Sequence, residues 1–184
     1  MEEKTLKKVL NIFKEFTDKS CPKEELKYAY YNSKRKELVA TDTIRLLIAE
    51  IDLGFDDSYY LDLNKKGNIT TGGIKIICSY NAYREVNRIY PKYENVIPNK
   101  LERNEFGVKY KGLKIKDVIV NVGSLTCTET IVAFNKAYDK LNDIDENTKI
   151  YLDKDYPDKE PVLIEWKSDL TNTNWKLIFQ PISK

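Results

Sequence analysis

The most informative stretch of the sequence reads Glu37-Leu38-Val39-Ala40-Thr41-Asp42-Thr43-Ile44-Arg45-Leu46. An apolar run leads into Thr41-Asp42, and a second β-rich run leaves through Arg45-Leu46. Apolar and β-branched residues favour strands, whereas aspartate favours turns. We therefore predict strands over residues 37–41 and 45–53, joined by a turn that holds the charged pair Asp42 and Arg45.

Similar runs elsewhere predict more strands. The polar link 32–36 is typical of a hairpin loop, so residues 26–31 should pair with 37–41. Alternating or β-branched stretches predict further strands, at residues 59–63, 74–79, 106–110, 114–122, 149–152, 162–166 and 175–179.

Two segments have helical periodicity. An apolar stripe recurs at three- and four-residue spacing over residues 3–19, through Leu6, Val9, Leu10, Phe13 and Phe16. A shorter stripe, from Ala133 to Leu141, predicts a second helix over about residues 132–142. Residues 81–89 are a weaker helix candidate, and the prolines around Val96-Ile97 predict an extended connector over 90–98. The fold class is therefore α+β, with two amphipathic helices on antiparallel sheets.

Composition narrows the functional classes. The net charge is +2, from 31 basic and 29 acidic residues, so DNA contact would need a local basic face. The chain has no histidine, which excludes Ser-His and Cys-His catalysis. Metal-ligand spacing, nucleotide-binding loops and membrane-length apolar runs are also missing from the sequence. We expect a cytoplasmic protein with no metal, no cofactor and no membrane contact, and not an enzyme.

Several segments resemble bacterial sliding clamps, the β subunits of replicative DNA polymerase. The opening stretch resembles their Val-Ala-Thr-Asp-Gly-His-Arg-Leu signature, with Thr43-Ile44 in place of Gly-His. Residues 134–141 are similar to the Phe-Asn-x-x-Tyr-Leu-x-x-Leu helix of the last clamp domain, and residues 90–98 to the Tyr-Pro-Asp-Tyr-x-x-Val-Ile-Pro connector. Pro161-Val162-Leu163-Ile164 matches a Pro-Val-x-Ile strand, in family order.

The resemblance implies one clamp-like domain over residues 1–184, with a divergent middle insertion at about 54–125. A bacterial clamp chain holds three such domains, and this chain has room for about one with an insertion, or one and a half. The connector joins two domains in clamps but lies in the middle here.

The resemblance also implies a hydrophobic groove that binds short linear peptides of replication or repair proteins. Carried over by position, the groove residues are Thr41, Thr43, Ile44, Arg45, Leu46, Pro98, Ile178, Gln180 and Pro181. Such a groove buries apolar anchors while a few polar groups fix the register of the peptide. A structural interpretation competes with it: Asp42 and Arg45 pin a β-turn, and Ile44 and Leu46 are core.

Clamp helices line a central hole and face DNA, so the resemblance implies DNA-facing lysines. The candidates are Lys7, Lys8, Lys14, Lys136 and Lys140. Their contacts to double-stranded DNA would be weak, sequence-independent and sensitive to salt. The competing interpretation is a solvated helix face, which the nearby acidic residues favour.

Two functions therefore stay open. The chain is either a small clamp that assembles a ring around DNA from several copies, or a clamp-derived interaction module that does not encircle DNA. Ring assembly needs free edge strands that pair between copies.

Overall fold

The computed structural model describes residues 1–63, 69–71, 74–76, 81–83, 89–107, 148–156 and 159–180. Contacts between Cα atoms divide the chain into two units, Met1–Tyr93 and Glu94–Lys184. The boundary between the units falls inside the range expected for the middle insertion, 54–125. One domain with a divergent middle stays a prediction.

The sheet of the first unit is built around the hairpin that the opening stretch predicts. Neighbouring strands are antiparallel, in the order β7 (Asn81–Tyr83), β4 (Tyr59–Asp62), β1 (Ala29–Asn32), β2 (Glu37–Thr41) and β3 (Arg45–Glu50). Thr41 pairs with Leu46 across the turn, and Glu37 pairs with Glu50 at the far end. A separate hairpin joins β5 (Ile69–Thr71) to β6 (Ile74–Ile76).

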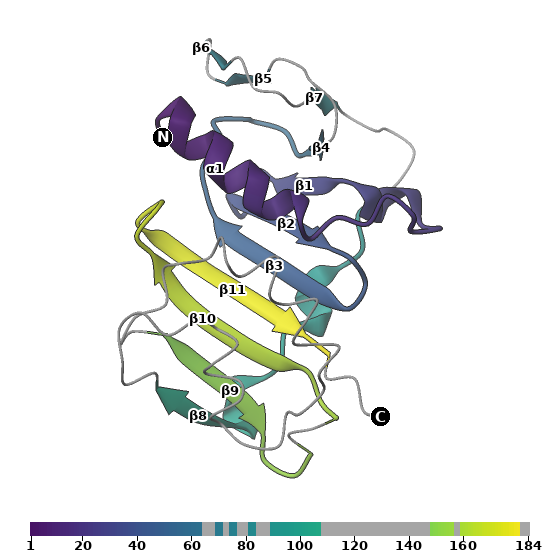
Figure 1. Ribbon diagram of the computed structural model, residues 1–184, viewed down its shortest axis with the longest axis vertical. Coiled ribbons are helices and arrows are strands. Elements are labelled where there is room, and N and C mark those ends of the chain that lie inside the picture. The colour runs from purple at the N-terminus through teal and green to yellow at the C-terminus, as the bar shows by residue number, and fades with distance from the viewer. Residues whose placement is uncertain are drawn as a thin grey trace. The chain divides into compact units, whose positions relative to one another are not determined.

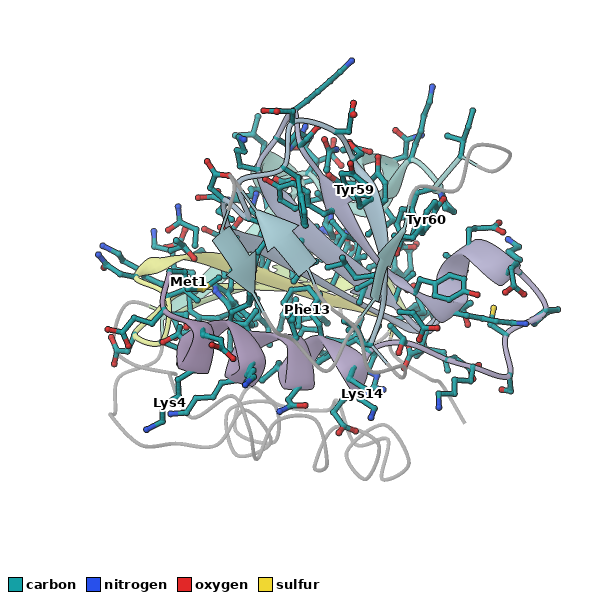
Figure 2. All side chains as sticks on the ribbon, turned by 90° about the horizontal axis from the view of Figure 1, so that it is seen from above. Met1, Lys4, Phe13, Lys14, Tyr59 and Tyr60 are labelled. Atoms are coloured by element: carbon teal, nitrogen blue, oxygen red, sulfur yellow. The ribbon has the colours of Figure 1, made fainter. Side chains whose placement is uncertain are left out.

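The core of the first unit lies between this sheet and α1 (Glu3–Lys14), which crosses it and contacts β2 (Figure 1). The strands β2 and β3 are buried over most of their length, as their continuous apolar runs predict. Figure 2 shows Phe13 pointing from α1 toward the strands, and Lys4 and Lys14 pointing away. The apolar stripe of α1 is thus the buried face, and its lysines lie on the other side.

The helix is shorter than the predicted 3–19. Its last turn tightens, because the N–H groups of Glu15, Phe16 and Thr17 donate to carbonyls three residues earlier. Bonds of this kind close a helix end. Phe16 is still fully buried, so the sequence stripe continues two residues past the helix itself.

The sheet of the second unit contains long, well-patterned strands. They are antiparallel, in the order β8 (Arg103–Gly107), β9 (Lys149–Asp153), β10 (Val162–Ser168) and β11 (Thr173–Phe179). Trp166 and Trp175 lie directly opposite each other on β10 and β11, with ring centroids 5.9 Å apart. The three strands predicted near the end of the chain are confirmed, each within two residues of its predicted ends.

Three local predictions are wrong. Residues 24–27 form a 3₁₀ turn, η1 (Glu24–Lys27), before β1, so the first strand begins later than expected. Residues 81–83 form β7 where a helix was the candidate, because pairing with β4 satisfies their backbone. The connector contains a 3₁₀ turn, η2 (Tyr93–Val96), closed by Ile97 N–H to the Glu94 carbonyl. The strand over 114–122 and the helix over 132–142 lie outside the described residues.

Candidate functional site

The turn between β2 and β3 is organised by the carboxylate of Asp42. Its Oδ1 accepts the backbone N–H groups of Ile44 and Arg45, at 3.2 and 2.7 Å. Thr41 Oγ1 accepts the N–H of Thr43 at 3.1 Å. Aspartate is favoured in turns because its side chain can make such local bonds. The result is a turn with its backbone donors satisfied from within.

Thr43 adopts a left-handed backbone conformation in this turn, with φ of 77°. Positive φ is uncommon for residues with a Cβ, and a β-branched residue there is a genuine outlier. Backbone strain of this kind persists only where the surroundings enforce it. The turn therefore holds Thr43 in a conformation that glycine would adopt without strain.

Arg45 connects the turn to the end of α1. Its guanidinium pairs with Asp42 Oδ2 at 2.5 Å from Nη2, and Nε donates to the same oxygen at 2.7 Å. Nη2 also donates to the carbonyl of Glu15 at 3.0 Å, and the guanidinium lies 4.9 Å from the centre of the Phe16 ring. A cation at a helix C-terminus satisfies exposed carbonyls and complements the helix dipole. Arg45 therefore acts as a cap for α1 supplied by another element.

The apolar residues that flank Arg45 are placed differently. Leu46 is buried, whereas Ile44 is exposed over 47% of its surface. The structural interpretation is thus right for Asp42, Arg45 and Leu46, and wrong for Ile44, which is not core. The turn presents an isoleucine side chain to solvent beside a fixed polar network.

The other groove candidates belong to the second unit. Pro98 is buried in the link between η2 and η3 (Lys100–Glu102). Ile178 is buried on β11, and exposed Gln180 donates its side-chain N–H to the carbonyl of Lys159. Pro181 lies outside the described residues. Thr41 and residues 43–46 therefore lie together on one turn of the first unit. Pro98, Ile178 and Gln180 belong to the second unit.

The candidate DNA-facing lysines of α1 are exposed. Lys7 pairs with Glu3 at 2.6 Å, one helical turn away, and Lys8 and Lys14 are also on the solvent side. Exposed Lys4 shares this face and was not among the sequence candidates, although its spacing to Lys7 and Lys8 could have indicated it. Lys136 and Lys140 lie outside the described residues.

Two further observations concern metals and membranes. Within the described residues no three acidic, histidine or cysteine side chains come together as a metal would require. None of the described helices is long and apolar enough to cross a bilayer.

Solved structures of bacterial sliding clamps share this fold. The chain aligns over 100% of its length with the DNA polymerase III β chain of Streptococcus pneumoniae TIGR4, with a TM-score of 0.58, 14% identity and 64% of that chain covered. The DNA polymerase III β subunit of Thermotoga maritima aligns with the same TM-score and sequence identity, over 100% of this chain and 65% of that chain. The Helicobacter pylori β clamp bound to a DNA ligase peptide aligns with a TM-score of 0.53 and 14% sequence identity, over 97% of this chain and 63% of that chain.

No family model and no curated protein matches the chain. The structural likeness shows that the chain has the DNA-clamp fold, which confirms the α+β class and the resemblance read from the sequence. The chain spans less than two thirds of the length of these β chains.

Proposed function

We propose that this protein is a sliding-clamp-like accessory factor of DNA replication that docks partner proteins through short peptides. The observation that carries the proposal is the fold likeness to sliding clamps over the whole chain, including a clamp that holds a DNA ligase peptide. The polar turn at Asp42 supports it, because it occupies the position of the clamp signature and presents Ile44 to solvent.

Peptide docking would use Ile44 as the accessible apolar contact and Thr41, Thr43, Arg45 and Leu46 as its support. Since Asp42 and α1 fix the guanidinium of Arg45, this side chain would shape the turn and not reach toward a peptide. Pro98, Ile178, Gln180 and Pro181 are proposed to complete the groove, by resemblance alone. A pre-organised turn lowers the entropy lost when a peptide binds.

Contact with double-stranded DNA is proposed for the exposed face of α1. Lys7, Lys8 and Lys14 would meet phosphates without reading sequence, and Lys136 and Lys140 are proposed to act with them. In this form of the proposal several copies of the chain assemble a ring, the protein works in the cytoplasm, and it catalyses no reaction.

One observation favours the alternative, an interaction module that does not encircle DNA. Lys7 is already paired with Glu3 on the surface of α1, as expected for a solvated helix face. Measuring the solution mass separates the two functions, because a strict monomer at micromolar concentration discards the ring and leaves the module.

Peptide docking is tested with the variant Ile44→Lys and a DNA ligase peptide as the probe. A charge placed in the apolar contact should weaken binding at least about tenfold, since burying an uncompensated charge is costly. Ile44 is exposed, so the variant should fold, whereas Leu46→Lys would place the charge in the core. Leu101→Lys is the matched control, at an apolar residue 85% exposed in the second unit. If Ile44→Lys and Leu101→Lys bind the peptide equally well, the turn is not part of the groove.

DNA contact is tested by exchanging Lys7 and Lys14 together for glutamate. Affinity for duplex DNA should fall, and the dependence of the remaining affinity on salt should flatten. Peptide binding should stay unchanged. Unaltered DNA affinity would remove α1 from the DNA-facing surface.

A further inference from the structure

A short segment just before the unit boundary is attached to the first unit by two side chains. We call residues 89–93 the strap. Ile89 is 93% exposed, and Pro91 and Lys92 are exposed as well, whereas Tyr90 and Tyr93 are buried. The attachment of the strap therefore depends on two tyrosines three residues apart.

Tyr90 attaches through aromatic contacts. Its ring is stacked on that of Tyr30, with centroids 4.7 Å apart and planes 8° from parallel. The rings of Tyr60 and Tyr93 lie 6.1 and 6.4 Å away. Such aromatic pairs add stability beyond that of the apolar area they bury. Tyr30 on β1 and Tyr60 on β4 thus form an aromatic surface that Tyr90 covers.

Tyr93 attaches through hydrogen bonds. Its hydroxyl donates to Glu37 Oε2 at 2.6 Å and accepts from Asn32 Nδ2 at 3.0 Å. Glu37 is buried and also accepts from Arg35 Nε at 2.7 Å. A hydroxyl bonded to a buried carboxylate makes a strong, charge-assisted contact. The hydroxyl of Tyr93 therefore both donates and accepts a hydrogen bond.

The hydroxyl of Tyr90 is different. It is buried and has no hydrogen-bond partner within the part of the chain that the structure describes. Burial among the other tyrosines raises the pKa of this phenol far above its ordinary value, so the group stays neutral. A buried hydroxyl without a partner loses its bonds to water and gains none in return. Water would satisfy it once the strap lifts.

We propose that the strap is a releasable attachment, with Tyr93 as its firm anchor and Tyr90 as the contact that opens. Opening rehydrates the Tyr90 hydroxyl, uncovers Tyr30 and Tyr60, and frees chain next to the unit boundary. Opening of the strap requires neither DNA nor a partner peptide, so it is independent of the proposed function. Two observations support this: the Tyr93 hydroxyl is fully hydrogen-bonded, and the buried Tyr90 hydroxyl has no hydrogen-bond partner within the described residues.

The test is the rate of trypsin cleavage between Lys92 and Tyr93 in the full native chain, followed by mass spectrometry. A protease must bind an extended segment, so cleavage here reports opening of the strap. Tyr90→Phe keeps the ring and removes the unsatisfied hydroxyl, and should slow cleavage about fivefold or more. Tyr93→Phe leaves Glu37 without its donor and should speed cleavage about tenfold. Tyr156→Phe, at a tyrosine 56% exposed in the second unit, is the matched control and should change nothing.

Each remaining outcome counts against the strap. Faster or unchanged cleavage of Tyr90→Phe would overturn the role of its hydroxyl. A Tyr93→Phe effect no larger than that of Tyr156→Phe would remove the anchor. If the cleavage rates of the variants follow only their free energies of global unfolding, measured in urea, then the strap does not open on its own. Cleavage of the urea-unfolded variants at equal rates excludes an effect on the protease itself.

Discussion

Besides Lys36 in the β1–β2 turn, two hairpin turns of the described residues, one in each unit, place a residue other than glycine in the left-handed region. Thr43 has φ of 77° between β2 and β3, and Asn172 has φ of 56° between β10 and β11. The second turn closes through the N–H of Asn172 to the Ser168 carbonyl at 2.7 Å. Asparagine adopts this conformation with little strain, whereas a β-branched threonine adopts it at a cost in backbone strain. The two turns therefore need the same left-handed backbone conformation but place different residue types in it.

The difference shows where the first unit accepts strain. In the second turn the residue at positive φ is one that suits it, so the backbone needs little support. In the first turn Asp42 and Arg45 hold the backbone, and Arg45 also bonds to the end of α1. Strain supported in this way often marks functional positions. Here it coincides with the turn that we propose as a docking site.

The largest expected effect comes from removing the support, with Arg45→Ala. This variant loses the ion pair with Asp42, the bond to Glu15 and the contact with the Phe16 ring. The side chains of the ion pair are only 12% and 17% exposed, so we expect a loss of about 2–3 kcal/mol in the free energy of unfolding. Urea denaturation measures it. Lys167→Ala, at an exposed position of β10, is the control and should stay within about 0.5 kcal/mol of the parent. A loss as small as that of the control would mean that the network does not support the turn.

Relieving the strain, with Thr43→Gly, should have a smaller effect of opposite sign. Glycine avoids the left-handed penalty of about 1–2 kcal/mol. It also costs about 0.5–1 kcal/mol of extra chain entropy. The net expectation is a gain of about 0.5–1 kcal/mol, read from the same urea curves. A destabilised glycine variant would show that the threonine side chain makes favourable contacts that outweigh its backbone strain.

The matching change in the other turn, Asn172→Gly, should have the smallest effect. Asparagine already accepts the left-handed conformation, so little strain is relieved and the entropy cost of glycine remains. We expect a change within about 0.5 kcal/mol in either direction. A gain equal to that of Thr43→Gly would erase the distinction between the two turns.

Much of the fold follows from local sequence. The hairpin at 37–50 and the three closing strands could be predicted because their apolar runs end at clear turn signals. The buried face of α1 follows from the spacing of Leu6 to Phe16, although the helix ends at Lys14. The exact end depends on bonds that close the last turn, and the sequence pattern does not distinguish these from helix.

The contacts that define the candidate site depend on residues far apart in the chain. The motif pointed to the Asp42–Arg45 pair, but nothing local indicates that Arg45 reaches the Glu15 carbonyl. The exposure of Ile44 follows from the left-handed turn at Thr43, which the residue type argues against. The Tyr30–Tyr90 stack joins residues sixty positions apart, so periodicity carries no signal for it.

The bond from Arg45 to Glu15 has a consequence for the order of events during synthesis. The helix leaves the ribosome thirty residues before the arginine that caps it. At about 5–20 residues per second, the nascent helix waits for a few seconds before Arg45 can bond to the Glu15 carbonyl, which until then is left to water. Short isolated helices are marginal in water. Stable formation of α1 should therefore coincide with the arrival of the β2–β3 turn, and a chain stalled before Arg45 should leave its N-terminal segment open to nascent-chain proteolysis.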